Sequence, residues 1–406
     1  MCLTFNLKKC RFVLIDKETN KTQTMENFVI YNPVKLHFGK DVVEKLGKNA
    51  AAIGKKALLV YGKGSVKKNG AYRQTLSSLQ QAGIEVVEYN GIKSNPVIED
   101  VDKASAIGRE ENVDLIVAVG GGSVIDSAKL MAITIPVEHS GWEFVDRDIK
   151  PKKALPLISV LTLAATGTEM NCFAVVQSDA ERKKSGYGHP LVFPRHSFLD
   201  PTYTLSVPEN YTSYGITDLV AHSLEAWFGE GETSLTDRFI VSIIREAMKY
   251  GPKLMDDLEN YDLRARIMYA ATMALNGLTV QGKKYQDWGV HAIGHCMSLK
   301  WDIPHGASLS IAYPAWLKLQ KERIPKRIQE LGHALFSADS IEDTIYKLEY
   351  FFKLIKSPVT LAELDIKPGK EEKDDLLQIM KMNKVDGLTH KLNEEDYSFL
   401  IEKMAG

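Results

Sequence analysis

The chain has 406 residues, of which 44% are hydrophobic and 25% are charged, so it has the composition of a globular protein and is long enough for two domains. Its 51 basic and 52 acidic residues leave a net charge of −1, which excludes the strongly basic surface that nucleic acids or anionic membranes require. The four cysteines form no C-x-x-C pair, and no apolar run approaches the roughly 18 residues of a membrane span. We therefore expect a soluble, cytoplasmic protein without a disulfide framework.

Residues 1–24 have the features of an N-terminal extension. They combine the basic side chains of Lys8, Lys9 and Arg11 with one short apolar stretch, FVLI, which is too short for a secretory signal. Acidic side chains interrupt the same segment, which argues against an organelle-targeting peptide. Met25, at the head of MENFVIYNPVKLHFG, has the features of a natural start, so we expect the first domain to begin there.

Residues 25–208 alternate between short β-rich runs and helical stretches. The runs ALLVYG, IEVVEYN, DLIVAVGGG and PLISVLTL predict strands, and NPVIEDVDKASAIGREENV predicts a helix between two of them. This alternation is typical of βαβ units, in which parallel strands form a sheet that helices cover on both faces. We therefore expect an α/β, Rossmann-like domain over residues 25–208, with its ligand at the carboxyl ends of the strands.

Three consecutive glycines, Gly120 to Gly122, follow one of these strands and precede a helix. Glycine lets backbone N–H groups approach a pyrophosphate, and the N-terminus of a helix favours negative charge. We predict that Gly121, Gly122 and Ser123 bind a dinucleotide, the alternative being a tight strand-to-helix turn without a ligand. Asp126 lies one turn inside the helix, where it could face the cleft, so we expect it to contact the cofactor and to act in catalysis.

Residues 209–406 show only helical periodicity. The stretches LTDRFIVSIIREAMKYGPKLMDDL and RARIMYAATMALNGL, for example, repeat apolar residues at three- and four-residue intervals. The pattern predicts an all-helical second domain, which carries the catalytic and metal-binding residues. Two domains imply a cleft between them, where a ligand can bind.

Two pairs of potential metal ligands in this second domain have the i, i+4 spacing that places side chains on one face of a helix: Asp218 with His222, and His291 with His295. One carboxylate with two or three imidazoles suits Fe²⁺ or Zn²⁺ and leaves a position for substrate. A single Asp-x-x-x-His pair is also common on ordinary helix surfaces. His305 follows a proline in the loop predicted after the histidine helix, and spacing alone does not decide whether it contributes.

Several motifs, taken in order, resemble those of the iron-containing (group III) alcohol dehydrogenases. They are GGGSVIDSAK, LTLAATGTEMN, FLDPTYT, DLVAHSLEAW and HAIGHCMSLKWDIPHGASLSI, and the resemblance extends from about Met25 onward. YNPVKLHFG, VYGKGSVKKNG and YQDWGVHAIGH further resemble the NADPH-dependent butanol dehydrogenase branch of that family. The resemblance implies a dehydroquinate synthase-like architecture, in which a dinucleotide-binding α/β domain precedes a helical metal-binding domain, and it implies a homodimer.

Carried over residue by residue, the resemblance implies that the metal ligands are Asp218, His222, His291 and His305. His295 is similar to a residue that the family keeps near the substrate without using it as a ligand. Because histidine titrates near neutral pH, His295 would suit a proton shuttle, the alternative being a hydrogen-bonded core histidine. For His305 to reach the site, the preceding helix must end near Trp301, so that a turn set by proline folds back.

The resemblance also implies cofactor contacts. Thr162, Thr166 and Thr168 in LTLAATGTE resemble the loop that lies along the cofactor diphosphate and nicotinamide, and Lys184 matches a lysine that reaches the ribose. LTLAATGTE departs from the commoner TTAGTGSE form, because Ala165 stands where that form has glycine.

The turn VYGKGSVKKNG bears on the choice between NAD(H) and NADP(H). Many relatives carry an aspartate near Gly62, where a carboxylate would bind the adenosine ribose and repel a 2′-phosphate. Gly62 lacks that charge, and its neighbours Lys63, Ser65, Lys67 and Lys68 offer cations and a hydroxyl to a phosphate. We therefore predict NADP(H), the alternative being that these lysines are only solvated surface.

The sequence thus predicts an NADP(H)- and metal-dependent alcohol dehydrogenase that interconverts aldehydes and primary alcohols. The rivals are a dehydroquinate-synthase-like or glycerol-dehydrogenase-like enzyme acting on a polyol, and a non-enzymatic dinucleotide-binding module with a structural metal. A polar substrate requires a polar pocket, whereas the residues around the histidines are apolar or aromatic, which favours a carbon-chain aldehyde. These residues are Trp288, Met297, Leu299, Trp301 and Ile303.

Overall fold

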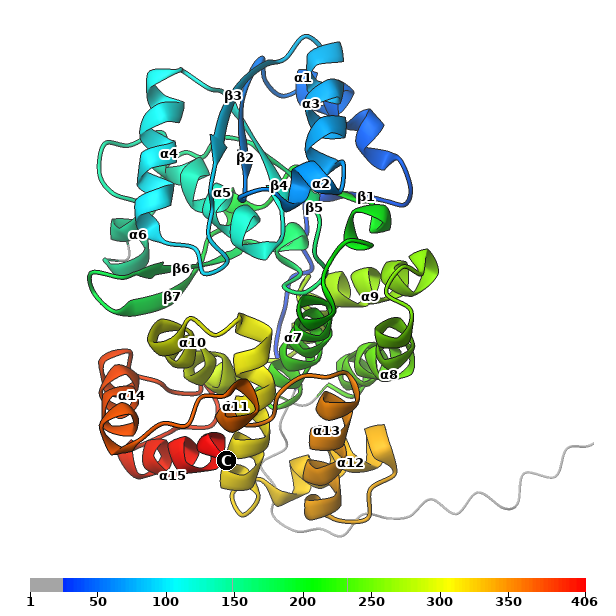
Figure 1. Ribbon diagram of the computed structural model, residues 1–406, viewed down its shortest axis with the longest axis vertical. Helices are drawn as coiled ribbons and strands as arrows, with labels where there is room; N and C mark the ends of the chain where they lie inside the picture. The colour runs from blue at the N-terminus through cyan, green and yellow to red at the C-terminus, as the bar shows by residue number, and fades with distance from the viewer. Residues whose placement is uncertain (1–24, 148, 232) are drawn as a thin grey trace, which may run out of the picture.

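The computed structural model describes residues 25–147, 149–231 and 233–406, so the extension predicted over residues 1–24 lies outside the described residues. An α/β half forms one end of the molecule and a helical half the other (Figure 1). This is the fold class that the sequence predicted. Among the described residues, no helix is long and apolar enough to cross a membrane.

The central sheet of the α/β half has six parallel strands in the order β1-β8-β5-β4-β2-β3. The strands are β1 (Lys35–Phe38), β2 (Lys56–Tyr61), β3 (Glu85–Asn90), β4 (Leu115–Gly120), β5 (Leu157–Leu161) and β8 (His196–Leu199). Every residue of β4 and β5 is buried, which explains why LIVAVG and LISVL are almost continuously apolar. The four strands predicted from the sequence are β2, β3, β4 and β5, whereas β1 and β8 were not predicted.

Helices cover both faces of this sheet. They are α1 (Leu46–Ala51), α2 (Ser65–Lys68), α3 (Ala71–Gln81), α4 (Ile98–Glu110), α5 (Gly122–Thr134) and α6 (Trp142–Asp146). Alternate residues of β2 serve the two faces, because side chains along a strand point to opposite sides. Leu58 and Val60 join a core with α4 and α5, whereas Leu59 and Tyr61 join a separate core with α1 and α3.

An antiparallel hairpin that the sequence did not predict, β6 (Phe173–Ser178) and β7 (Lys183–Gly188), stands outside the main sheet. Its turn reaches the helical half, where Arg182 lies 3.0 Å from Asp375 and Lys300 lies 2.5 Å from the same carboxylate. The hairpin therefore connects the two halves beside the cleft.

The helical half contains α7 (Glu209–Trp227), α8 (Ser234–Asp256), α9 (Tyr261–Ala274), α10 (Gly289–Trp301), α11 (His305–Gln320), α12 (Pro325–Phe336), α13 (Ile341–Leu354), α14 (Lys370–Met382) and α15 (Glu394–Ala405). α7 and α11 are buried along most of their length and pack against each other, and the Tyr313 hydroxyl donates to the Ala221 carbonyl at 3.1 Å. These two helices, with α10, supply the polar side chains at the cleft.

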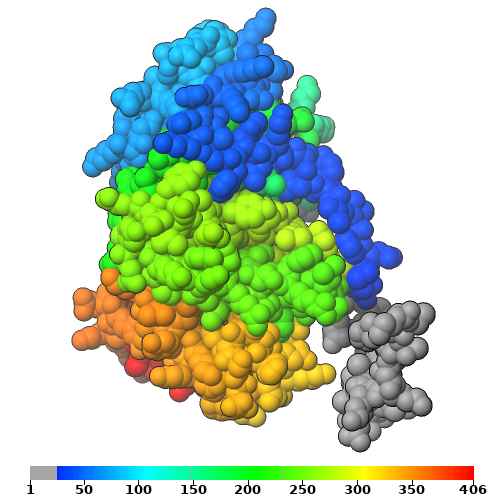
Figure 2. Space-filling model, turned by 90° about the vertical axis from the view of Figure 1, so that its right-hand side faces the viewer, coloured from blue at the N-terminus to red at the C-terminus, as the bar shows by residue number. Residues whose placement is uncertain are grey.

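The segment before β1 runs in extended form down the flank of the molecule and reaches the helical half (Figure 2). The Asn32 side chain donates to the carbonyl oxygens of Met170 and Asn276, which lie in different halves. Val29 and Ile30 are 89% and 70% exposed, so this segment also presents apolar side chains to solvent.

Candidate metal centre and cofactor cleft

A cavity of about 1150 Å³ lies between the two halves. Its lining includes the following predicted site residues: Gly62, Lys63, Ser65, Gly121, Gly122, Ser123, Thr162, Thr166, Asp218 and His305. The cavity therefore joins the glycine loop after β4 to the predicted metal ligands of the helical half. Parallel strands end at one edge of a sheet, which is why the loops after β2, β4 and β5 reach the same cavity.

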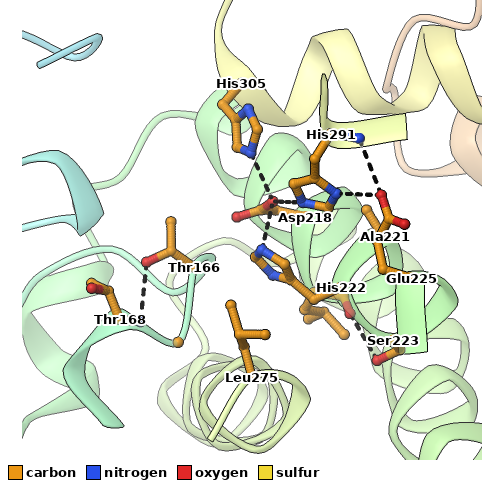
Figure 3. A network of polar contacts seen from close by, with 12 residues as sticks. Thr166, Thr168, Asp218, Ala221, His222, Ser223, Glu225, Leu275, His291 and His305 are labelled. Atoms are coloured by element: carbon orange, nitrogen blue, oxygen red, sulfur yellow. Dashed lines mark hydrogen bonds and ion pairs between the residues drawn. The ribbon is translucent and has the colours of Figure 1, made fainter. Parts of the chain in front are cut away.

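Three histidines surround one carboxylate oxygen at the end of this cavity (Figure 3). The Nε2 atoms of His222, His291 and His305 lie 3.8, 3.9 and 3.6 Å from Asp218 Oδ1. Asp218 and His222 come from α7, His291 comes from α10, and His305 comes from α11. The i, i+4 pair and two later histidines thus converge from three helices.

These four side chains fit a divalent metal ion. Ligands about 2.1 Å from one ion in tetrahedral arrangement lie about 3.4 Å from each other, close to the separations found here. Among the described residues, Asp218 Oδ1 and His291 Nε2 are buried and have no hydrogen-bond partner. Unpaired buried polar atoms are costly, so a ligand that satisfies them stabilises the site.

The electrostatics of the site also favour a cation. Burial lowers the pKa of His291 to about 3 and holds the pKa values of His222 and His305 well below their usual range, so the imidazoles are neutral ligands. Burial, followed by the negative charge of Asp126, raises the pKa of Asp218 to about 8. A divalent ion would supply the positive charge that this buried carboxylate lacks.

His305 differs from its prediction in one respect. It does not lie in a loop but is the first residue of α11, directly after Pro304. α10 ends at Trp301, as expected, and Asp302 takes a left-handed conformation with φ 52° that turns the chain. Proline is tolerated at a helix start because its missing N–H needs no partner there, so one short turn joins the two helices.

His295 lies beside the four candidate ligands. Its ring centroid is 5.4 Å from that of His305, and its Nε2 atom has no hydrogen-bond partner among the described residues. Burial, with smaller effects of Lys184 and His291, holds the pKa of His295 well below its usual range. A neutral imidazole with a free nitrogen can exchange a proton, which leaves the predicted shuttle role open to test.

Glu225, a buried carboxylate on α7, was not predicted from the sequence. Its Oε1 atom accepts a hydrogen bond from Nδ1 of His291 at 2.7 Å (Figure 3). The available signal was its spacing, because Glu225 follows Asp218 by seven residues and His222 by three, which places all three on one helix face.

The glycine loop meets the threonine loop after β5. A Cβ atom on Gly122 would lie 2.6 Å from the Thr166 side chain, so glycine is required there for close packing. Gly121 is different, because the nearest neighbour of a Cβ at that position is Leu163 at 3.3 Å, and its φ of −81° suits any residue. Gly121 therefore leaves open the space through which a ligand approaches the start of α5.

Asp126 and Lys184 do not line the cavity. Asp126 accepts hydrogen bonds from the Thr168 hydroxyl at 2.6 Å and from the backbone N–H of Val175 at 2.9 Å. Lys184 donates to Asn95 at 2.8 Å, and Asn95 in turn donates to Asp302 at 2.6 Å. Both side chains are buried within protein contacts, so their predicted roles at the cofactor remain predictions.

The turn after β2 places only part of the predicted lysine set at the cavity. Lys63 lines it, whereas Lys68 does not, and the Lys67 ammonium lies over the rings of Tyr61 and Tyr72 at 5.1 and 4.8 Å. Lys93, in the loop after β3, also lines the cavity and was missed from the sequence.

The apolar residues that favoured a carbon-chain substrate need correction. Of the five residues cited from the sequence, only Leu299 lines the cavity. Met297 and Ile303 are core residues, Trp301 packs against the same core, and Trp288 packs against the rings of His222 and His291. The cavity has another apolar wall, made by Leu163, Val207, Pro208, Tyr211 and Tyr214. The substrate argument therefore rests on the loop after β5, on α7 and on the segment directly before α7.

The protein has a parallel sheet of the dinucleotide-binding type, and this sheet faces a helical half with a cluster of one carboxylate and three histidines. This combination defines a class of two-domain proteins that use a nicotinamide cofactor and a metal. Residues 33–201 match the iron-containing alcohol dehydrogenases, and residues 212–396 match the C-terminal part of the same family. The chain belongs to the iron-containing alcohol dehydrogenase family.

Individual relatives span nearly the whole chain. The chain is 40% identical over 387 residues to the probable NADH-dependent butanol dehydrogenase 1 of Bacillus subtilis, which covers 93% of this chain and 99% of that protein. It is 36% identical to the NADPH-dependent aldehyde reductase of Escherichia coli over 76% of this chain and 80% of that protein. The crystal structure of NADH-dependent butanol dehydrogenase A from Thermotoga maritima has a TM-score of 0.91 at 34% identity, covering 95% of this chain and 100% of that chain.

Proposed function

We propose that the protein is a metal- and nicotinamide-dependent alcohol dehydrogenase that interconverts aldehydes and primary alcohols, with butanal-type substrates. The observation that carries the proposal is the cavity that joins the glycine loop after β4 to Asp218 and His305. A cofactor on that loop and a substrate oxygen at the histidines would share this one cavity. Both curated relatives described above are named for related activities, which supports the proposal.

The residues of the chain have distinct parts in this proposal. Asp218, His222, His291 and His305 would hold the metal. The metal would act as a Lewis acid toward the carbonyl oxygen, and the nicotinamide would supply the hydride. The apolar wall that includes Leu163 and Tyr214 excludes water and contacts the carbon chain of the substrate. His295 delivers the proton.

A spectrophotometric assay at 340 nm with butanal and NADPH or NADH tests the activity. Steady oxidation of the cofactor, dependent on butanal, is the expected result. Recycling of the cofactor without net oxidation would favour the dehydroquinate-synthase-like lyase. Reduction of NAD(P)⁺ by glycerol, without butanal-dependent oxidation of NAD(P)H, would favour the polyol enzyme, and no turnover in either direction would favour a binding module.

We propose NADP(H) as the preferred cofactor, on the ground that Gly62 places no carboxylate where the adenosine ribose would bind. Relatives carry names of both kinds, so the choice belongs to this chain's own residues. Lys63 and Lys93 line the cavity on the loops after β2 and β3 and offer cations to a 2′-phosphate.

Gly62→Asp is expected to reverse this preference. A Cβ at Gly62 meets nothing closer than the Ile92 carbonyl at 3.5 Å, so the β-carbon of an aspartate causes no clash. A unit charge about 4 Å from a phosphate oxygen costs about 1 to 4 kcal/mol, so NADPH binding should weaken by about fivefold or more. The measurement is kcat/KM for NADPH and NADH in both proteins, with Gly186→Asp, which adds the same charge at a position outside the cavity lining, as the control. A wild type that prefers NADH, or a ratio that Gly62→Asp does not change, would refute the assignment.

We also propose a homodimer. Within the described sheet β1 is an edge strand, paired only with β8, and the segment before it exposes Val29, Ile30 and Tyr31. Edge strands and exposed apolar side chains favour association. Sedimentation should give twice the chain mass for the wild type and a monomer for Ile30→Asp, and a monomeric wild type would refute the proposal.

A further inference from the structure

Glu225 lies behind the candidate metal site, where its two carboxylate oxygens meet the start of α10. Oε1 accepts hydrogen bonds from Nδ1 of His291 at 2.7 Å and from the His291 backbone N–H at 3.1 Å. Oε2 accepts a hydrogen bond from the backbone N–H of Trp288 at 2.5 Å. Glu225 is only 1% exposed, so these contacts form away from water. One side chain therefore binds both the start of a helix and a candidate ligand that the helix carries.

We propose that Glu225 is the positioning residue of the metal site, keeping the His291 proton on Nδ1 so that Nε2 presents its lone pair to the ion. Burial raises the pKa of Glu225 to about 8, while the backbone N–H groups of Trp288 and His291 favour its ionised form. An ionised carboxylate can only accept, and a neutral imidazole has one donor and one acceptor nitrogen. The bond to Glu225 therefore selects one tautomer. His291 Nε2, 3.9 Å from Asp218 Oδ1, has no other hydrogen-bond partner among the described residues.

The arrangement requires glutamate rather than glutamine. Each of the two oxygens receives an N–H group, so an amide would place its NH₂ against either Trp288 or His291. Two donors facing each other leave one group unpaired, or they move the His291 proton to Nε2, which removes the lone pair. The same carboxylate also raises the basicity of the ligand, as is usual for carboxylate–histidine–metal contacts.

The test uses the full-length chain, stripped of metal and titrated with Zn²⁺ against a chromophoric chelator. Glu225→Gln is expected to bind Zn²⁺ about 10- to 100-fold more weakly than the wild type. Nitrogen-15 NMR of the metal-free wild type at a pH above 8, where Glu225 is ionised, should show the Nδ1-protonated tautomer, with the His291 signal assigned by its loss in His291→Ala. That readout needs no Glu225 variant, so an Nε2-protonated His291 in the wild type would overturn the proposal even if Glu225→Gln fails to fold.

Asp287→Asn is the matched control. Asp287 is also a buried carboxylate at the start of α10, but it accepts backbone N–H groups of Gly289, Thr389 and His390. The Asp287→Asn protein should be less stable than the wild type and should bind Zn²⁺ with unchanged affinity. Equal losses in both variants, or none in Glu225→Gln, would overturn the role of Glu225 alone. This inference rests on the proposed metal site, so a wild type that does not bind Zn²⁺ would overturn both.

Discussion

His305→Ala is expected to lose bound metal and catalytic activity together. His305 is one of the three histidines whose Nε2 atoms lie within 4 Å of Asp218 Oδ1. Loss of a contact behind a ligand weakens metal binding by about 10- to 100-fold, and removal of a ligand itself should exceed that. Metal content per chain after gel filtration, measured beside butanal reduction, checks the result.

His295→Ala provides the comparison, because His295 lies on the same helix as His291 and its ring is 5.4 Å from that of His305. It should retain metal and lose rate by about 10²- to 10⁴-fold, the usual contribution of a general acid. The opposite pattern, with metal lost from His295→Ala and kept by His305→Ala, would show that the ligands are the i, i+4 pair on α10. The assignment of His305 would then be wrong.

Gly121→Val is expected to abolish cofactor binding without unfolding the chain. The φ of Gly121 is −81°, so a branched residue meets no backbone strain, and its side chain would extend into the cavity beside Leu163. There it would separate the N-terminal N–H groups of α5 from a diphosphate. Loss of two charge-assisted hydrogen bonds costs about 3 kcal/mol or more, which is about hundredfold or more in affinity.

Fluorescence titration with NADPH measures this effect, and thermal unfolding confirms that the variant is folded. Gly186→Val is a suitable control, since no atom lies within 4 Å of a Cβ at Gly186 and this residue lies on the β6–β7 hairpin. Unchanged NADPH affinity in Gly121→Val would remove the glycine loop from the binding site.

Much of the fold could be predicted from local pattern. Buried parallel strands such as β4 are apolar along their whole length, and Gly120 to Gly122 mark the turn into α5. The hydrophobic pattern and the turn residues were therefore enough to predict these elements. The edge strand β1 and the short strand β8 have four residues each, too few for a periodic signal. Strand β7 of the hairpin was missed because its sequence, KKSGYG, is neither apolar nor regularly alternating.

The site, like the fold, has a part that local sequence pattern predicts and a part that depends on tertiary packing. The pair Asp218 and His222 is visible because both residues share one helix face, but the approach of α11 to α7 depends on tertiary packing that spacing does not encode. His305 begins a helix because the turn at Asp302 is short. The left-handed backbone of Asp302, which makes this turn, could not be predicted from the sequence. Apolar residues near a motif were a poor guide to the cavity lining, because Met297 and Ile303 serve the core.

The most direct test of the metal-dependent mechanism is reconstitution of the metal-free protein. Chain stripped of metal under anaerobic conditions is titrated with Fe²⁺ or Zn²⁺ while bound metal and butanal reduction by NADPH are followed together. The account predicts no turnover without metal and activity that rises in proportion to bound ion, with Asp218→Ala inactive throughout. Full turnover by the metal-free wild type, or undiminished activity in Asp218→Ala, would contradict it.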